Sequence, residues 1–177
     1  MLYRLVYFFF NPVIRYEGRF IISGRSQSEL RRLRNPENFL LRLNGTLSRF
    51  PDIKFIFSNA GGTIPILADR LSRLDRRPDC KRHIPDGVIA ALKRLYYETA
   101  LSANRPAMNA LFGLVPPTQV LFGSDYPYAP EEAMLGTVKG LSALNLLAAD
   151  LAAVERTNAI RLMPSIQAND SMEERLH

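Results

Sequence analysis

Four polar positions at the ends of short apolar stretches carry the residues that could do chemistry in this chain of 177 residues. They are Asn11, Asn59, Glu98 and Asp125. Asp125 is the strongest of these, because it follows an apolar stretch through a glycine, and a carboxylate there can bind a metal ion or move protons. An aspartate that caps the next turn is the alternative interpretation, and the pattern by itself does not choose between them.

The segment 58–62, Ser-Asn-Ala-Gly-Gly, is the second candidate. Its two glycines would let the backbone approach a ligand closely, whereas the same residues also suit a tight turn between a strand and a helix. For a bare Gly-Gly pair the turn is the favoured interpretation. The two histidines of the chain, His83 and His177, follow no predicted strand, and we expect both to be solvated rather than catalytic.

The apolar stretches that precede these positions are short, and helical patterns separate them. Strands are predicted where aromatic or β-branched residues end at a turn, at 5–10, 53–57, 96–99 and 120–122. Helices are predicted where apolar residues recur at helical spacing after a cap or a proline, at 35–50, 63–74, 86–95, 104–115, from 130 onward and at 150–162. The segments 14–34 and 76–85 are predicted to be mostly loop.

The alternation of strand and helix predicts an α/β protein with parallel strands and crossover helices. A doubly wound sheet and a (β/α) barrel both satisfy this order, and four strands are too few to close an eight-stranded barrel. In either architecture the carboxyl ends of the parallel strands are where α/β enzymes place their sites. The four polar positions would therefore lie at that edge.

The composition fits a globular protein, with 47% hydrophobic and 23% charged residues. The net charge of +6 could attract anions, but the basic stretches at 25–34 and 70–82 are broken by acids and leucines and hold no interleaved aromatic residues that could stack on bases. We therefore expect no nucleic-acid partner. The apolar opening at 1–10 is shorter than the about 20 residues that span a bilayer and lacks a signal-peptide cleavage site, so no membrane association is expected.

Cys80 is the single cysteine of the chain, which excludes an internal disulfide and a cysteine-only metal site. This cysteine usage fits a cytoplasmic protein. The sequence contains no G-x-S-x-G elbow and no G-x-x-x-x-G-K-[ST] loop, so nucleophilic-serine and P-loop chemistries are excluded.

Several segments, in this order and at this spacing, resemble the amidohydrolase-related family that includes aminocarboxymuconate semialdehyde decarboxylase and the resorcylate decarboxylases. The matching segments are 45–58, 60–65, 95–100 and 120–127, and Asn158-Ala159 resembles the family's usual ending. Together they cover most of the chain from about residue 38 onward.

The resemblance implies a partial TIM (β/α)8 barrel of the metal-dependent hydrolase superfamily, with strands five to eight and their helices present. It implies a barrel domain over 1–166 and a polar tail over 167–177. It also implies a divalent metal, zinc or manganese, with Asp125 and Asn11 at positions of metal ligands, and Asp125 and Asn59 at positions that act in catalysis.

Three departures from the family pattern weaken that site. The H-x-H motif of the family's first strand is absent from the chain, and asparagine stands at positions 11 and 59, where the resemblance expects histidine. A catalytic zinc takes about three protein ligands. Asparagine does not titrate near pH 7, so the general acid–base contribution at position 59, worth about 10²–10⁴-fold in rate, is lost.

The resemblance therefore implies a decarboxylase or hydrolase acting on a small carboxylic substrate, in a truncated and impaired form. The alternative hypothesis is a catalytically silent half-barrel that associates with an intact homologue or with a second copy of itself. Unpaired strand edges would favour such association. Metal binding and the oligomeric state distinguish the two hypotheses.

Overall fold

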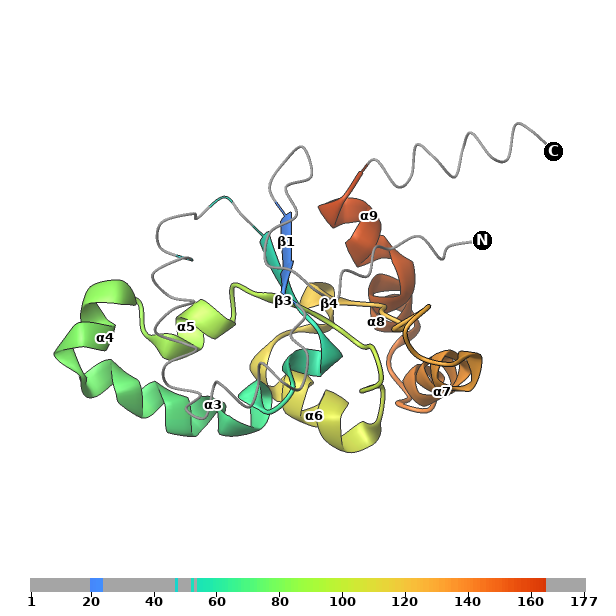
Figure 1. Ribbon diagram of the computed structural model, residues 1–177, viewed down its shortest axis with the longest axis horizontal. Helices are drawn as coiled ribbons and strands as arrows, with labels where there is room; N and C mark the ends of the chain where they lie inside the picture. The colour runs from blue at the N-terminus through green and yellow to red at the C-terminus, as the bar shows by residue number, and fades with distance from the viewer. Residues whose placement is uncertain (1–19, 24–46, 48–51, 53, 165–177) are drawn as a thin grey trace.

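The fold is built on four parallel strands, seen in a computed structural model that describes residues 20–23, 47, 52 and 54–164 (Figure 1). The strands are β1 (Phe20–Ser23), β2 (Lys54–Phe57), β3 (Tyr96–Glu98) and β4 (Val120–Leu121). They are hydrogen-bonded in sequence order, and all three pairings are parallel. This confirms the predicted parallel α/β architecture, and three of the four strands begin within a residue of their predicted positions.

The first strand is where the sequence-based prediction was wrong. Residues 14–34 were expected to be mostly loop, yet Phe20–Ser23 pairs with Lys54–Phe57 along its full length. A four-residue strand leaves too short an apolar run to stand out among glycines and arginines, and the pairing with β2 supplies the order. The strand predicted at 5–10, and Asn11 with it, lies outside the described residues.

Helices connect and follow the strands: α3 to α6 lie below or to the left of the strands in Figure 1, and α7 to α9 lie on the right. They are α3 (Ile64–Ser72), α4 (Pro78–His83), α5 (Val88–Leu92), α6 (Arg105–Leu114), α7 (Glu131–Ser142), α8 (Ala148–Ala152) and α9 (Asn158–Leu162). Single turns at η1 (Asn59–Gly61), η2 (Arg73–Arg76) and η3 (Pro117–Gln119) and the π-helical η4 (Ala153–Thr157) complete them.

Helix α4 replaces the polar loop that was predicted at 76–85. It buries one side chain, Cys80, so it has no apolar stripe to reveal it. Its ends nevertheless follow the rules for helices, because Pro78 stands in the first turn with Asp79, and Lys81 and Arg82 occupy the last turn, where they complement the helix dipole.

Helix α5 is capped by Asp75, 13 positions before Val88, and not by Asp86, with which the predicted helix 86–95 begins. The backbone N–H of Val88 donates to Asp75 Oδ1 at 2.9 Å. Asp86 instead pairs with Arg94 at the surface, over 3.4 Å. The start of α6 was predicted to within a residue, and Asn104 caps the helix, since its Oδ1 accepts the N–H of Ala107 at 3.0 Å.

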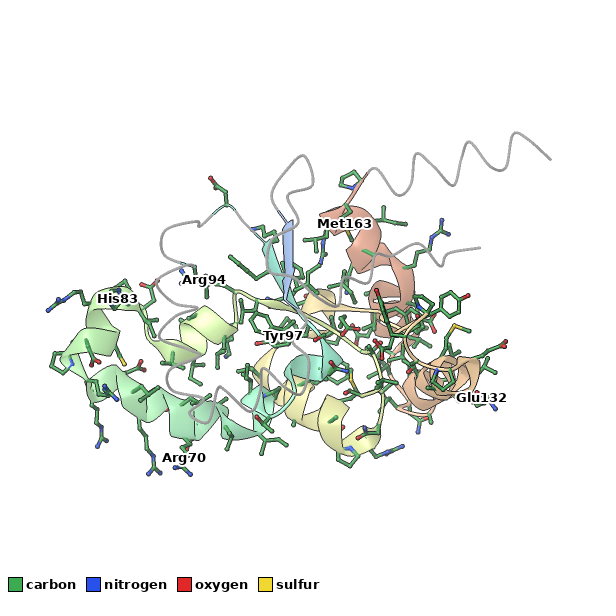
Figure 2. The ribbon with its side chains drawn as sticks, viewed as in Figure 1. Arg70, His83, Arg94, Tyr97, Glu132 and Met163 are labelled. Atoms are coloured by element: carbon green, nitrogen blue, oxygen red, sulfur yellow. The ribbon has the colours of Figure 1, made fainter. Side chains whose placement is uncertain are left out.

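The two faces of the sheet pack against different helices. The larger core cluster joins alternate strand residues such as Phe55, Phe57 and Tyr97 to buried residues of α3, α5 and α6. Figure 2 shows Tyr97 at the centre of this packing. The opposite face carries a smaller cluster in which Ile56 and Leu121 meet Leu162 of α9. Glu98 is paired in register with Leu121, so its side chain belongs to this second face.

The final helical segment covers one edge of β4. The N–H of Thr99, directly after β3, donates to Leu121 O, so Leu121 faces β3 with its backbone oxygen. Because the backbone groups of a strand alternate in direction, the C=O of Val120 and the N–H of Phe122 point to the other side of β4. Val120 O accepts the side-chain amide of Asn158 at 2.7 Å. The N–H of Phe122 donates to Val154 O at 2.8 Å, within the π-helical turn. Asn158 also donates to Pro117 O at 2.8 Å.

None of the helices within the part of the chain that the structure describes has both the length and the apolar character needed to cross a membrane.

Candidate active site at the strand ends

Three of the four polar positions chosen from the sequence fall within the described residues, and all three lie at the carboxyl edge of the sheet. Asn59 begins η1 directly after β2, Glu98 is the last residue of β3, and Asp125 follows β4. Since the strands are parallel, these segments emerge side by side. Asn11 lies outside the described residues, so its predicted role as a metal ligand stays a prediction.

Glu98 connects the segments that follow β2 and β3. Its Oε1 accepts the backbone N–H of Asn59 at 2.6 Å, and its Oε2 accepts the backbone N–H of Ala100 at 2.7 Å. The residue is 8% exposed. A buried carboxyl with two backbone donors is well satisfied, so this arrangement is a stable part of the fold rather than a chance contact.

Burial sets the protonation of Glu98. Burial away from solvent is the largest effect and raises the pKa of Glu98 to about 7. The N–H groups of Ala100 and Asn59 lower this pKa, and the charge of Asp125 raises it by a smaller amount. A carboxyl with a pKa near 7 exchanges protons readily at neutral pH, which is unusual for a glutamate and typical of functional sites.

Asn59 uses its side chain to hold the local backbone. Its Nδ2 donates to Ala100 O at 3.0 Å, while its own backbone N–H donates to Glu98. Both Asn59 and Ala60 have positive φ angles, of 56° and 53°. That left-handed conformation suits asparagine better than most residues. The predicted catalytic position 59 is therefore occupied by a half-buried amide that is already engaged with the strand-end backbone.

Asp125 is buried at the end of the segment that follows β4. The residue is 7% exposed, and its atom Oδ1 is fully covered. Its φ is 64°, its carbonyl oxygen accepts the N–H of Ala129 at 2.7 Å, and a cis peptide bond joins the next two residues, Tyr126 and Pro127. Burial raises the pKa of Asp125 above its usual range. A second carboxyl whose pKa is raised by burial thus lies at this edge.

Thr99 and Gly123 join β3 to the Asp125 segment. The Thr99 hydroxyl donates to Gly123 O and accepts from Gly123 N, each over 3.1 Å. Gly123 also leaves room for Glu98, because a Cβ placed there would come within 1.6 Å of Glu98 Oε2. The glycine before Asp125 is thus required by the neighbouring carboxyl.

The described residues provide part of a metal site at most. No group of three or more His, Cys, Asp or Glu side chains with suitable spacing occurs in residues 54–164 or at the other described positions. Asp125 can serve as one ligand, whereas both oxygens of Glu98 already accept backbone N–H groups. A catalytic zinc needs about three protein ligands and an open position, so the described residues alone do not fit one. His83 lies exposed on α4, at the left of Figure 2 and away from Tyr97 and the strands.

Comparison with known proteins gives a consistent family match. A family model described as amidohydrolase matches residues 39–164. The chain is 34% identical over 128 residues to a 6-methylsalicylic acid decarboxylase of Penicillium expansum, covering 72% of this chain and 40% of that protein. The chain thus spans about two fifths of the length of this curated relative.

Solved structures show the same fold. The crystal structure of an amidohydrolase II superposes with a TM-score of 0.62 at 24% identity, over 72% of this chain and 40% of the other. A 5-carboxyvanillate decarboxylase of Novosphingobium aromaticivorans, crystallised with manganese, gives a TM-score of 0.57 at 19% identity, over 71% of this chain and 37% of the other. The expected partial barrel is therefore confirmed as a fold.

Proposed function

Because the chain belongs to the amidohydrolase family, we propose that it carries the strand-end half of a carboxy-lyase site for a small aromatic carboxylic acid. The observation that carries the proposal is the burial of Asp125 at the carboxyl edge of the sheet, where Asn59 and Glu98 also lie. The activity itself belongs to a whole barrel, of which these four strands form a part.

Carboxy-lyase chemistry is favoured over hydrolysis for two reasons. The relative that is 34% identical is named for decarboxylation of 6-methylsalicylic acid. In addition, loss of CO₂ from an aromatic carboxylate leaves a carbon that must take up a proton, so a proton donor is required at the strand-end edge. Burial raises the pKa of Asp125, and it raises that of Glu98 to about 7. We assign the donor role to Asp125, because both Glu98 oxygens accept backbone N–H groups.

A divalent metal, manganese or zinc, is the proposed cofactor, and Asp125 is its proposed ligand among the described residues. Asp125 would bind the metal as the ionised carboxylate and would act as proton donor only in its protonated form, so the two proposed roles belong to different stages. Further ligands would have to come from outside the described residues. The proposed substrate is a small carboxylic acid, the proposed location is the cytoplasm, and no nucleic acid takes part.

A catalytically silent scaffold is the second candidate, and one observation favours it. Position 59, where the family resemblance expects a proton-transferring histidine, holds an amide that donates to Ala100 O. Such a group cannot move a proton near pH 7. In this case the chain would bind a homologue or a second copy and would catalyse nothing.

Turnover of 6-methylsalicylic acid tests the two candidates. The full chain is incubated with Mn²⁺ or Zn²⁺ and the acid, and formation of CO₂ and 3-methylphenol is followed by chromatography. Asp125→Asn should lower turnover by at least about 10²-fold. Asp69→Asn is the matched control, since Asp69 is exposed on α3, and it should leave turnover unchanged. A folded wild-type chain with bound metal and no turnover of aromatic acids would refute the carboxy-lyase proposal and leave the scaffold.

A further inference from the structure

The role of Glu98 in this site is neither that of a metal ligand nor that of the proposed proton donor, because both of its oxygens accept backbone N–H groups. We infer that Glu98 is a positioning residue, whose buried carboxyl holds the turn of Asn59 and the turn of Asp125 at one fixed spacing. The hydrogen bonds from Asn59 N and Ala100 N to its two oxygens are called the Glu98 bridge below. The catalytic consequence of the inference rests on the proposed function, whereas the bridge itself does not.

On the β2 side, the Glu98 bridge stabilises the left-handed backbone conformation of the turn at Asn59 and Ala60. Asn59 and Ala60 both have φ angles near +55°, at 56° and 53°. Asparagine adopts this left-handed conformation more readily than most residues, whereas alanine keeps it only where its surroundings impose it. The bond from Asn59 N to Glu98 Oε1 and the return bond from Asn59 Nδ2 to Ala100 O impose it here. The strand-end turn after β2 is thereby tied to the end of β3.

On the β4 side, the bridge fits into space that Gly123 leaves open. An added Cβ at position 123 would meet Glu98 Oε2 at 1.6 Å and Glu98 Cδ at 2.7 Å. Two bonds from the Thr99 hydroxyl fix Gly123 itself against β3. Asp125 follows two residues later with a φ of 64°. Movement of the Glu98 carboxyl is therefore transmitted through Gly123 to the segment that carries Asp125.

Two substitutions disturb the bridge in independent ways. Glu98→Gln keeps the size of the side chain but replaces one acceptor oxygen with an NH₂ group, which faces a backbone N–H and cannot accept it. Gly123→Ala keeps the carboxyl and displaces it. In a Glu98→Ala background, Gly123→Ala should be much milder, because Oε2 and Cδ of Glu98 are gone and only the contact with its Cβ at 3.3 Å remains, and this non-additivity identifies the coupling. Gly113→Ala is the matched control, since a Cβ there meets nothing within 4 Å.

Backbone amide NMR reads the bridge without reference to activity. In the wild-type chain, the amide protons of Asn59 and Ala100 should resonate downfield, as expected for short bonds to a carboxylate. Glu98→Gln should remove that displacement for Asn59 or for Ala100, since the amide keeps one acceptor oxygen, Gly123→Ala should reduce it for both, and each should also shift the amide of Asp125. Gly113→Ala should leave all three resonances in place.

Steady-state kinetics read the positioning role. For variants that circular dichroism shows to be folded, kcat should fall about 10²-fold, as expected for misplaced reacting groups, while KM stays within a few-fold. Unchanged amides of Asn59, Ala100 and Asp125 in Glu98→Gln would overturn the inference whatever the activity. A folded variant with shifted amides and normal kcat would reduce Glu98 to a structural role, which also overturns it. A wild-type chain with the amide signature and no turnover would refute the proposed function alone.

Discussion

Asn158 ties the last helix to the start of β4, and its replacement by alanine tests how strongly that tie stabilises the fold. The side chain is 2% exposed. Its Nδ2 donates to Pro117 O at 2.8 Å and to Val120 O at 2.7 Å, and its Oδ1 accepts from Arg161 at 3.2 Å. Asn158→Ala removes all three bonds and leaves buried carbonyl groups without this donor.

The magnitude follows from those bonds. Each neutral hydrogen bond contributes about 0.5–1.5 kcal/mol net, and a buried polar group left without a partner costs about 1–3 kcal/mol. Alanine suits a helix slightly better than asparagine, which offsets a few tenths of a kcal/mol. We therefore expect Asn158→Ala to lower the free energy of unfolding by about 2–4 kcal/mol. In a chain of this size the midpoint of thermal unfolding should fall by about 5–15 °C.

Urea denaturation followed by circular dichroism measures the loss, with Asn109→Ala as control. Asn109 is an exposed asparagine in the middle of α6, so its replacement should change the free energy of unfolding by less than about 0.5 kcal/mol. If the two variants unfold at the same urea concentration, the assigned role of Asn158 is wrong.

Three further predictions follow from the structure. Burial raises the pKa of Glu98 from 4.5 to about 7 in the fold, so the folded chain holds the Glu98 proton over a pH range in which the unfolded chain has lost it. The free energy of unfolding should therefore fall as pH rises from about 4.5 to 7 and level off above, by about 1.4 kcal/mol per pH unit and on the order of 3–4 kcal/mol in all. Urea titrations at several pH values should show this fall in wild type and not in Glu98→Gln. Asp75→Ala should cost about 1 kcal/mol, because Asp75 caps α5 through Val88 N, whereas Asp86→Ala should change thermal stability little, because its pair with Arg94 is exposed; equal losses would contradict the cap assignment. Gly136→Ala, in the exposed middle of α7 with nothing within 4 Å of the new Cβ, should raise the free energy of unfolding by about 0.5–1 kcal/mol, and a loss by calorimetry would show that the helix is strained there.

The order of elements was predictable because it depends on local patterns. Apolar runs that end at Phe57 and Phe122 are strong strand signals, and Asn104 followed by Pro106 marks the start of α6. Helix α4 was missed because a six-residue polar helix has no apolar stripe, although Pro78 and the charges at its two ends were visible in the sequence. The division at 166 between barrel domain and tail lies beyond the described residues and stays a prediction.

The site was predictable in its positions and not in its contacts. Asn59, Glu98 and Asp125 were all identified as strand-end residues, yet nothing in the spacing indicated that Glu98 accepts the N–H of a residue 39 positions away. The same limit applies to Asp75, whose bond to Val88 spans 13 positions. Such partners are set by how strands and helices pack, so a sequence pattern of short period cannot contain them. The roles of Asn59 and Asp125 in catalysis or metal binding stay predictions.

The helical cover over β4 bears on how the protein meets other chains. Val120 O and Phe122 N, the groups that an incoming strand would need, are already bonded to Asn158 and Val154. A strand that extends the sheet on this side can pair with β4 only after η4 and α9 have separated from it. The rate of that separation would limit domain swapping or fibril growth at this edge. Weakening the cover through Asn158 would therefore make β4 a point at which the protein begins to aggregate.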